Sequence, residues 1–582
     1  MSDFSLLIKN GTIIDGSGKE KLKGDIGVSD GKIVEIGNLG KVSGDRVIDA
    51  KDRFVSPGFI DNHAHSDWTI LVHPTGDSKV MQGVTTEFGG LCGYAAAPIN
   101  RDEWWKLLYV RMTVGWSMHY SAAAYNSWPL PYGRQLDVDW SSMAEYLDRL
   151  EKTGIGLNYG MLFGHGSIRY YAMGLEARNS EEHELDEMKE MARQAMDDGA
   201  FGMSAGLSGC PGCWADTEEL IELNRVVKSY DGVYMPHMRS SYLQSSVEES
   251  IEIAEKSGVR TCMSHTRLNP KTRELVDKAR SRGVDISFDM YPYPGSIAGN
   301  IVYMLPHWLS KRREEGFDWV IDQFRDPEIR KQFIEKDYPK WRSIQASVPS
   351  KPPYIPDAES LEPAWSNMQL QQVWTTENRK YIGMSFHEIA EERDVDPWTA
   401  WLDMEVEEKG YLRWLNFRGS SYEDMFNPDL VEQLKVPYIS IESDAPIESP
   451  RGVTVSSADP RAYGSFPLIL GEYVRKRGLL TWEDAIMKMT SNPAKTLDIK
   501  DRGLLREGFW ADIVVFDPET VSHKANFKNC LELSQGINHD VYSTGIDYTI
   551  VNGTVVVEKG MLTGEFPGSV LRHARTTREL GD

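Results

Sequence analysis

Two kinds of segment alternate through the middle of the chain. Short apolar runs that end in polar or glycine-rich residues are followed by stretches with helical spacing, such as 180–199 and 245–258. Strands that alternate with helices predict a parallel sheet, and eight such units predict a closed α/β barrel. The eight runs are residues 58–65, 83–93, 154–167, 199–208, 232–240, 260–267, 284–293 and 436–446.

The two ends of the chain have a different pattern. Apolar segments in residues 1–56 and 492–566 are separated by Asn-Gly, Asp-Gly and Gly-x-Gly turns, which are typical of β-hairpins. We therefore predict one small β-sandwich domain built from both termini, although two independent hairpin caps would give the same pattern. The barrel domain then spans 57–491, and residues 567–582 form a C-terminal tail. Two insertions, at about 100–140 and 295–435, interrupt the barrel, and the second is too long for a plain connection.

Metal-ligating side chains stand at the ends of five of the eight runs. His63 and His65 are two residues apart on a strand, so they point to the same face and can chelate one divalent ion. The other candidates are Cys92, His237, His265 and Asp444. Because neighbouring strand ends of a barrel converge on one pocket, this set predicts a site for zinc, or else manganese, with one ion or two. Taken singly, Cys92 could be a small buried residue and Asp444 a helix N-cap.

Asp444 has a second expected role. A divalent metal lowers the pKa of bound water to about 7 and polarises a substrate carbonyl. A carboxylate within hydrogen-bonding reach can accept the proton of that water and deliver it to the leaving group. We therefore predict that Asp444 is the acid/base of a metal-dependent hydrolase.

Charge and composition narrow the range of partners. The 582 residues include 64 Lys and Arg against 87 Asp and Glu, a formal charge of −23 that repels phosphate backbones and anionic lipid. We expect a small-molecule substrate and neither nucleic acid nor membrane as a partner, and a homo-oligomer is compatible with the sequence. The N-terminus lacks a signal-peptide pattern, and five cysteines do not make a disulfide framework, so we expect the cytoplasm.

Several longer motifs occur in a specific order, including PGFIDNHAHSD, QGVTTEFGGLCG, GHGSIR, SFDMYPY, SDAP and STGIDYTIVNG. In these motifs the chain resembles the amidohydrolase superfamily, and within it the D-aminoacylase (N-acyl-D-amino-acid deacylase) family, almost from end to end. The resemblance implies a distorted TIM (β/α)8 barrel. It also implies a metal site of Cys92, His237 and His265, a weaker or shared site framed by His63 and His65, and Asp444 as acid/base. The resemblance further implies that the α-carboxylate of the substrate is bound by Arg267, Arg461 and a tyrosine, which is Tyr291 or Tyr293.

Some substrate-side positions depart from the family pattern. The family's HPRAYG is Asp459-Pro460-Arg461 here, and its SHHK is SHTR. We predict hydrolysis of the amide of an N-acyl-D-amino acid. The alternative is ring opening by a cyclohydrolase, including C–C cleavage of a cyclic 1,3-diketone or opening of a cyclic amide, which needs no contact with an α-carboxylate. A non-catalytic scaffold is disfavoured because all six ligand candidates are present.

Two further features have less specific interpretations. Tryptophans and tyrosines crowd residues 104–132 of the first insertion, where they would form core, a dimer contact or a wall of the pocket. Cys210 and Cys213 have the CxxC spacing of redox proteins, but they lie in a loop after a barrel run without the expected helix start, which disfavours redox catalysis.

Overall fold

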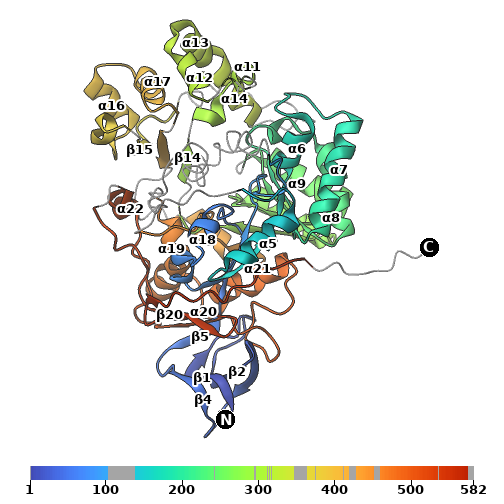
Figure 1. Cartoon of the computed structure of the whole chain (residues 1–582), viewed down its shortest axis with the longest axis vertical. Helices are drawn as coiled ribbons and strands as arrows, with labels where there is room; N and C mark the ends of the chain where they lie inside the picture. Colours follow the sequence, from blue (N-terminus) through green and yellow to red (C-terminus); the bar gives the residue numbers. More distant parts are fainter. Residues whose placement is uncertain are drawn as a thin grey trace, which may run out of the picture.

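Three parts follow one another along the long axis of the molecule: a sheet that holds the N-terminus, a barrel, and an inserted helical region (Figure 1). The computed structural model describes residues 2–101, 138–240, 243–293, 296–299, 301–310, 312, 315, 317–345, 363–373, 375–410, 412–417, 426, 428–450, 459–534 and 537–573. The aromatic residues predicted to line the first insertion, 104–132, lie outside these ranges.

Each of the eight predicted runs contains a parallel strand of the barrel. The strands are β6 (Phe59–Asp61), β7 (Val84–Gly89), β8 (Asn158–Met161) with β9 (Phe163–Gly164), β10 (Gly202–Gly206), β11 (Val233–His237), β12 (Arg260–Met263), β13 (Ile286–Met290) and β17 (Ile439–Ile441). They form two sheets, β6-β7-β8 and β9-β10-β11-β12-β13-β17, with parallel pairing throughout. A parallel bridge between Ala64 and Ala445 closes the ring. The predicted α/β class and distorted TIM barrel are therefore confirmed.

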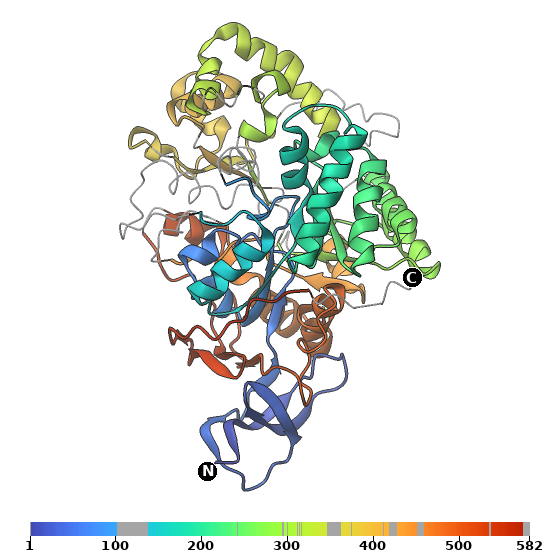
Figure 2. The same cartoon turned by 45° about the vertical axis from the view of Figure 1, so that its right-hand side comes forward.

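Amphipathic helices cover the outside of the barrel. Figure 2 shows the helices of residues 180–280 side by side along one flank. Their starts carry the expected caps: Asp216 accepts from the backbone of Glu219, and Asn269 precedes Pro270 at the first helical position. The barrel helices are α1 (Thr69–Val72), α2 (Asp77–Val80), α5 (Met143–Thr153), α6 (His165–Met173), α7 (Glu182–Asp197), α8 (Thr217–Ser229), α9 (Gln244–Ser257), α10 (Pro270–Ser281), α18 (Pro428–Leu434), α19 (Arg461–Leu468), α20 (Trp482–Met489) and α21 (Ser491–Thr496).

Both ends of the chain enter one nine-stranded sheet with its own apolar core. Its strands are β1 (Phe4–Ile13), β2 (Leu22–Ser29), β3 (Lys32–Gly37), β4 (Gly44–Asp49), β5 (Phe54–Pro57), β18 (Ile513–Phe516), β19 (Ile546–Val551), β20 (Thr554–Glu558) and β21 (Met561–Leu562). Strand β5 pairs with β1 on one side and with β18 on the other, so the two termini are not independent hairpin caps. On this basis we propose residues 1–56 and 492–566 as one domain, 57–491 as the barrel domain, and 567–582 as a tail. The described part of that tail lies against the barrel, where Val570 bridges Tyr159.

The second insertion has a separate core, which includes Trp401 and Trp414. It contains a three-stranded sheet, which the sequence analysis does not predict, and several helices. These elements are β14 (Ser296–Gly299), β15 (Met368–Gln372), β16 (Arg413–Phe417), α11 (His307–Ser310), α12 (Phe317–Asp322), α13 (Pro327–Gln332), α14 (Tyr338–Gln345), α16 (Phe386–Arg393) and α17 (Pro397–Glu407). Outside it lies α22 (Phe527–Ser534). Among all the helices that the structure describes, none has the length and apolar composition needed to cross a bilayer.

Candidate metal centre

The ends of five barrel strands bring the predicted ligands together. His63 and His65 follow β6, and the remaining candidates come from four other strands: Cys92 after β7, His237 at the end of β11, His265 after β12 and Asp444 after β17. The side chains form two groups, in each of which the ligand atoms lie within 4.8 Å of one another. One group is His63, His65, Cys92 and Asp444, and the other is Cys92, His237 and His265. Cys92 therefore belongs to both groups.

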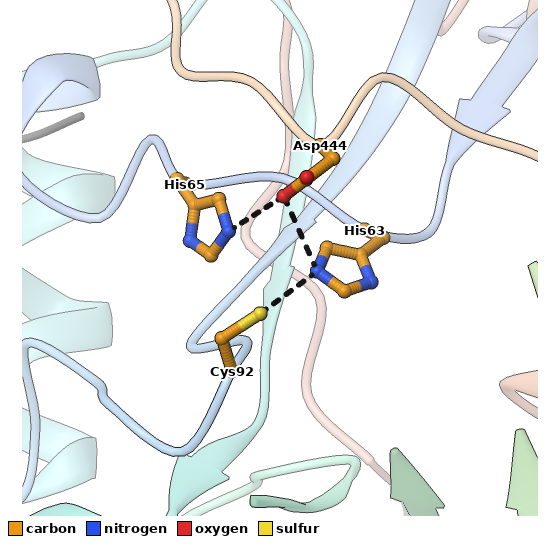
Figure 3. Close-up of side chains that lie close together, drawn as sticks. All are labelled: His63, His65, Cys92 and Asp444. Carbon is orange, nitrogen blue, oxygen red and sulfur yellow. Dashed lines mark hydrogen bonds and ion pairs between the residues drawn. The ribbon is translucent and has the colours of Figure 1, made fainter. Parts of the chain in front are cut away.

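The first group is drawn in Figure 3. Cys92 Sγ lies 3.4 Å from His63 Nε2, and Asp444 Oδ1 lies 3.0 Å from His65 Nε2 and 3.7 Å from His63 Nε2. The two histidines that contact Asp444 and Cys92 in this picture lie around a common centre with them, between the strand ends. His63 and His65 are buried, whereas the side chain of Asp444 is 13% exposed.

In the second group Cys92 Sγ lies 3.5 Å from both His237 Nδ1 and His265 Nε2. A tetrahedral zinc ion with bonds of about 2.3 Å to sulfur and about 2.1 Å to nitrogen places these two atoms about 3.6 Å apart. The observed separations thus match two ligands of one ion. One thiolate with imidazoles suits zinc better than manganese, which prefers oxygen ligands.

Three of these residues have backbone conformations that side-chain-bearing residues rarely adopt. The φ angle is +53° at Cys92, +34° at His265 and +45° at Asp444. Such left-handed conformations cost about 1–3 kcal/mol each and persist where the surroundings fix them, typically at functional sites. The loop of Cys92 is also tightly packed, since a Cβ on Gly93 would lie 2.3 Å from the backbone nitrogen of Gly206. The fold thus holds the backbone of these three residues in place at a cost in conformational free energy.

The electrostatics of the centre favour the deprotonated forms of Cys92 and Asp444, which are the forms that bind metals. Burial acts to raise the pKa of the Cys92 thiol, but the charges of His63 and His237 hold it well below its ordinary value. The thiolate is the form of cysteine that binds metals. Burial likewise acts to raise the pKa of Asp444, yet the Arg461 guanidinium and the hydrogen bond with His65 hold it well below its usual range. Asp444 is therefore ionised at neutral pH.

Asp289, at the end of β13, supports the ligands but is not among the predicted site residues. Its Oδ2 lies 3.5 Å from His63 Nδ1 and accepts from Asn62 Nδ2 at 3.3 Å, while its Oδ1 accepts from the backbone nitrogen of His265 at 2.6 Å. A carboxylate on Nδ1 fixes the ring so that Nε2 faces the centre. The signal available in the sequence is a lone acidic residue at the end of an apolar barrel run.

Lys79 is a second supporting residue that the sequence analysis does not identify. Its ammonium group is fully buried and donates to Asp61 Oδ2 at 2.7 Å, Ser443 Oγ at 2.7 Å and Ala445 O at 2.8 Å. It therefore joins the strand that carries His63 to the two residues that flank Asp444. Lys79 lies in the short helix α2, and the residues next to it in the sequence do not distinguish it from a lysine on the surface.

The four predicted substrate-binding residues lie on one side of the centre. Arg267 is half-buried, donates to the carbonyl of Tyr293, and places its guanidinium 5.4 Å from the ring centre of Tyr291. Arg461 is buried, lies 4.4 Å from the same ring, and pairs with Asp444. The Tyr293 hydroxyl donates to the carbonyl of Pro460 at 3.4 Å. The structure thus brings Arg267, Tyr291 and Arg461 next to the centre, while the Tyr293 hydroxyl contacts backbone.

The inserted region also reaches this side of the barrel. Arg413, the first residue of β16, is buried, and the charges of Glu448 and Asp459 act on its guanidinium. Burial lowers the pKa of Arg413 and outweighs those two carboxylates, which act to raise it. The insertion therefore contributes a cation beside the residues that follow β17.

A TIM barrel with a thiolate–imidazole centre and an ionised carboxylate at its mouth defines a metal-dependent hydrolase. A family model described as "Amidohydrolase family" matches residues 46–219 and 441–557, half of the chain, so the protein belongs to the amidohydrolase family. The predicted resemblance is confirmed.

Relatives of known activity match almost the whole chain. An N-acyl-D-glutamate deacylase of Alcaligenes xylosoxydans xylosoxydans is 28% identical over 98% of this chain and 96% of its own. A solved N-acyl-D-glutamate deacylase from Bordetella bronchiseptica, complexed with zinc and a phosphonate mimic of the tetrahedral intermediate, is 26% identical with a TM-score of 0.72 over 98% of this chain and 99% of its own. A D-aminoacylase structure with a binuclear metal centre is 26% identical with a TM-score of 0.71 over 98% and 100%.

Proposed function

We propose that this enzyme hydrolyses the amide bond of an N-acyl-D-amino acid to a carboxylic acid and a free amino acid. The observation that carries the proposal is the Asp444 carboxylate, which belongs to one of two ligand groups that share Cys92. The relatives and structures cited above, which match almost the whole chain at 26–28% identity, are deacylases of acyl-D-amino acids, and this supports an amide substrate over the cyclic substrates of a cyclohydrolase.

Zinc is the metal that best fits the donor atoms. Cys92, His237 and His265 would hold one ion, and His63 and His65, with Cys92 and Asp444, would frame a second or shared position. When bound, a divalent ion there supplies a Lewis acid for the scissile carbonyl and lowers the pKa of water. Manganese is the alternative for the oxygen-richer group, which contains the Asp444 carboxylate.

Asp444 moves the proton in the proposed reaction. Its carboxylate is ionised and accepts a proton as water attacks the scissile carbonyl, then delivers that proton to the amide nitrogen as the C–N bond breaks. The same residue can do both because the proton travels only from one side of the reacting carbon to the other. His65 at 3.0 Å and Arg461 at 2.6 Å hold its two oxygens and so orient the group.

A substrate carboxylate needs a local cation because the whole chain carries a formal charge of −23. Arg267 and Tyr291 stand beside His265, with the Tyr291 ring 6.4 Å from the His265 ring. A planar guanidinium binds a carboxylate through two parallel hydrogen bonds. We assign the α-carboxylate subsite to this side of the centre.

Assembly into a homo-oligomer stays a prediction of the sequence, which light scattering of the purified protein checks.

The test is a substrate panel with zinc-loaded protein. Release of free amine from N-acetyl-D-amino acids and from their L-enantiomers is measured in parallel, together with opening of a cyclic 1,3-diketone and a cyclic amide. We expect turnover of D-substrates, slower turnover of L-substrates, and none with Asp444→Asn. Turnover of a cyclic substrate without release of amine from any N-acetyl-D-amino acid would contradict the proposal.

A further inference from the structure

The loop that connects β10 to α8, residues 207–215, contains the CxxC cysteines, which the proposed function does not use. This loop lies directly against the segment of Cys92. A Cβ on Gly206, the residue before the loop, would lie 2.3 Å from the carbonyl oxygen of Cys92, so the two backbones approach more closely than a side chain would allow. The hydroxyl of Tyr94, two residues after Cys92, donates to the carbonyl of Cys210 at 2.5 Å.

The same loop also holds the segment of His237. Its first residue, Leu207, donates its backbone N–H to the carbonyl of His237 at 2.9 Å. Arg239, two residues after His237, contacts the other end of the loop. Its Nη1 donates to the carbonyl of Cys213 at 2.9 Å, and its Nη2 donates to the carbonyl of Ala215 at 2.6 Å. Two of the three segments that carry ligands of the second group therefore meet at this loop.

Arg239 is itself fixed by a buried carboxylate. Its Nε donates to Glu249 Oε2 at 2.9 Å and its Nη2 to Glu249 Oε1 at 3.1 Å. The two side chains are 0% and 2% exposed, and Thr217 Oγ1 donates to the same carboxylate at 3.0 Å. Two parallel bonds to one carboxylate set the orientation of the planar guanidinium. Its remaining donors then face the two loop carbonyls.

The loop matters most for His237, because two other histidines of the centre are supported by a carboxylate. Asp289 lies 3.5 Å from His63 Nδ1 and accepts from the backbone nitrogen of His265 at 2.6 Å. Among the residues that the structure describes, the hydrogen-bonding partner of the His237 ring is Cys92 Sγ, at 3.5 Å. The position of this ring therefore depends on its own backbone, to which the loop is bonded.

We propose that Arg239 and Tyr94 are positioning residues for the metal centre and act through the loop 207–215, which sets the separation of Cys92 and His237. The inference rests on the metal centre of the proposed function and not on its substrate. Cys92 Sγ and His237 Nδ1 lie 3.5 Å apart, close to the separation of about 3.6 Å that one tetrahedral zinc ion requires. Loss of either contact with the loop frees the two ligands to move apart. The CxxC segment serves here through its backbone carbonyls and not through its thiols.

The test measures metal binding and needs no turnover. The zinc affinity of Arg239→Met and of Tyr94→Phe is determined by chelator competition, and each variant is also loaded with cobalt, whose thiolate charge-transfer band reports the bond to Cys92. We expect Arg239→Met to bind zinc at least about 10-fold more weakly and to lose intensity in that band. Tyr94→Phe keeps the ring and loses one hydrogen bond, so we expect a smaller loss of zinc affinity, about 2- to 10-fold.

Arg502→Met is the matched control. Arg502 pairs with Asp512 in the terminal sheet, and the two side chains are 3% and 4% exposed. Its hydrogen-bond partners, Asp512 and Asn552, do not flank a predicted ligand. Both this variant and Arg239→Met lose a buried ion pair, so both should unfold at a lower temperature, but only Arg239→Met should bind zinc more weakly. An equal loss of zinc affinity in Arg502→Met would attribute the effect to general destabilisation and overturn the inference.

Tyr94→Phe decides the question if Arg239→Met does not fold. Zinc affinity equal to that of the wild type in either folded variant would refute the positioning role of that residue, and in every folded variant it would refute the role of the loop. Failure of the wild type to bind zinc would instead refute the proposed function. Zinc binding without hydrolysis of any N-acetyl-D-amino acid would refute the proposed substrate and leave the positioning role intact.

Discussion

The Lys79→Met substitution tests whether the buried ammonium group holds the centre together. Lys79 donates three hydrogen bonds of 2.7–2.8 Å and lies 3.4 Å from Glu87, and all of these groups are fully buried. Methionine has nearly the same shape but no charge, so Asp61 is left without its cation. Removing one partner of a buried ion pair costs about 3–5 kcal/mol. We expect the free energy of unfolding to fall by about 4 kcal/mol.

This loss has two measurable consequences. An unfolding entropy of about 2.1 cal/mol/K per residue gives about 0.9 kcal/mol/K for the barrel domain proposed above, so a loss of about 4 kcal/mol should lower the unfolding temperature of the apo protein by about 4 °C. Lys79 also holds Ser443 and Ala445 on either side of Asp444, and a displacement of about 1 Å at the reacting groups can cost about 100-fold. We therefore expect kcat to fall 10- to 100-fold at a temperature where the variant is folded, with KM changed less.

Two controls separate this mechanism from a general effect of losing a lysine. Lys278 forms an exposed i,i+4 pair with Glu274, so Lys278→Met should change neither the unfolding temperature nor kcat. The double variant Asp61→Asn with Lys79→Met removes the stranded carboxylate and should recover part of the lost stability. If the double variant is no more stable than Lys79→Met, or if Lys79→Met matches the wild type in both assays, the buried-charge argument is wrong.

Two further predictions concern the candidate centre, and a third concerns the buried histidine His523. Cys92→Ser removes the ligand common to both groups and should lower zinc content after dialysis by at least one ion per chain, with a loss of more than about 10³-fold in kcat; full zinc occupancy would show that Cys92 is not a ligand. Asp289→Asn should weaken zinc binding about 10- to 100-fold in chelator competition, because it releases His63 Nδ1; unchanged affinity would remove Asp289 from the site. Burial lowers the pKa of His523 to about 4, below the unfolded value near 6.5, so stability is present above that value and is lost as pH falls toward 4. His523→Gln should remove about 2 kcal/mol of the difference between pH 7 and pH 5 in urea unfolding, and an unchanged difference would count against this.

The barrel and its ligand candidates could be read from the sequence because each signal is local. A strand buried on both faces is a continuous apolar run, and the polar residue that ends it is visible within a few positions, as with His237 at the end of β11. The terminal sheet was likewise visible in its turns, but the pairing of β5 with β18 joins residues more than 450 positions apart and required coordinates.

The supporting residues could not be found in this way because their partners are remote in sequence. Lys79 meets Ser443 across 364 positions, and Asp289 meets Asn62 across 227. Arg461 was identified as a substrate-binding candidate, but spacing alone does not reveal that it pairs with Asp444. For Cys210 and Cys213 the sequence and the structure agree. The loop context in the sequence disfavours redox catalysis, and in the structure burial raises the pKa of the Cys213 thiol, which disfavours its reactivity.

The position of the centre explains why so many buried charges surround it. Strands β6 and β17 belong to different sheets, and the barrel closes between them at the bridge of Ala64 with Ala445. Here Asp444 N donates to His63 O at 3.0 Å and His65 N to Ala445 O at 3.4 Å, in place of a regular ladder. This irregular junction between the ends of β6 and β17 cannot by itself fix the position of Asp444 relative to His63 and His65. Lys79 with Asp61 from one side, and Arg461 with Asp459 from the other, supply that constraint through side chains. Changes at these four residues should therefore act on Asp444 before they affect the remaining barrel strands.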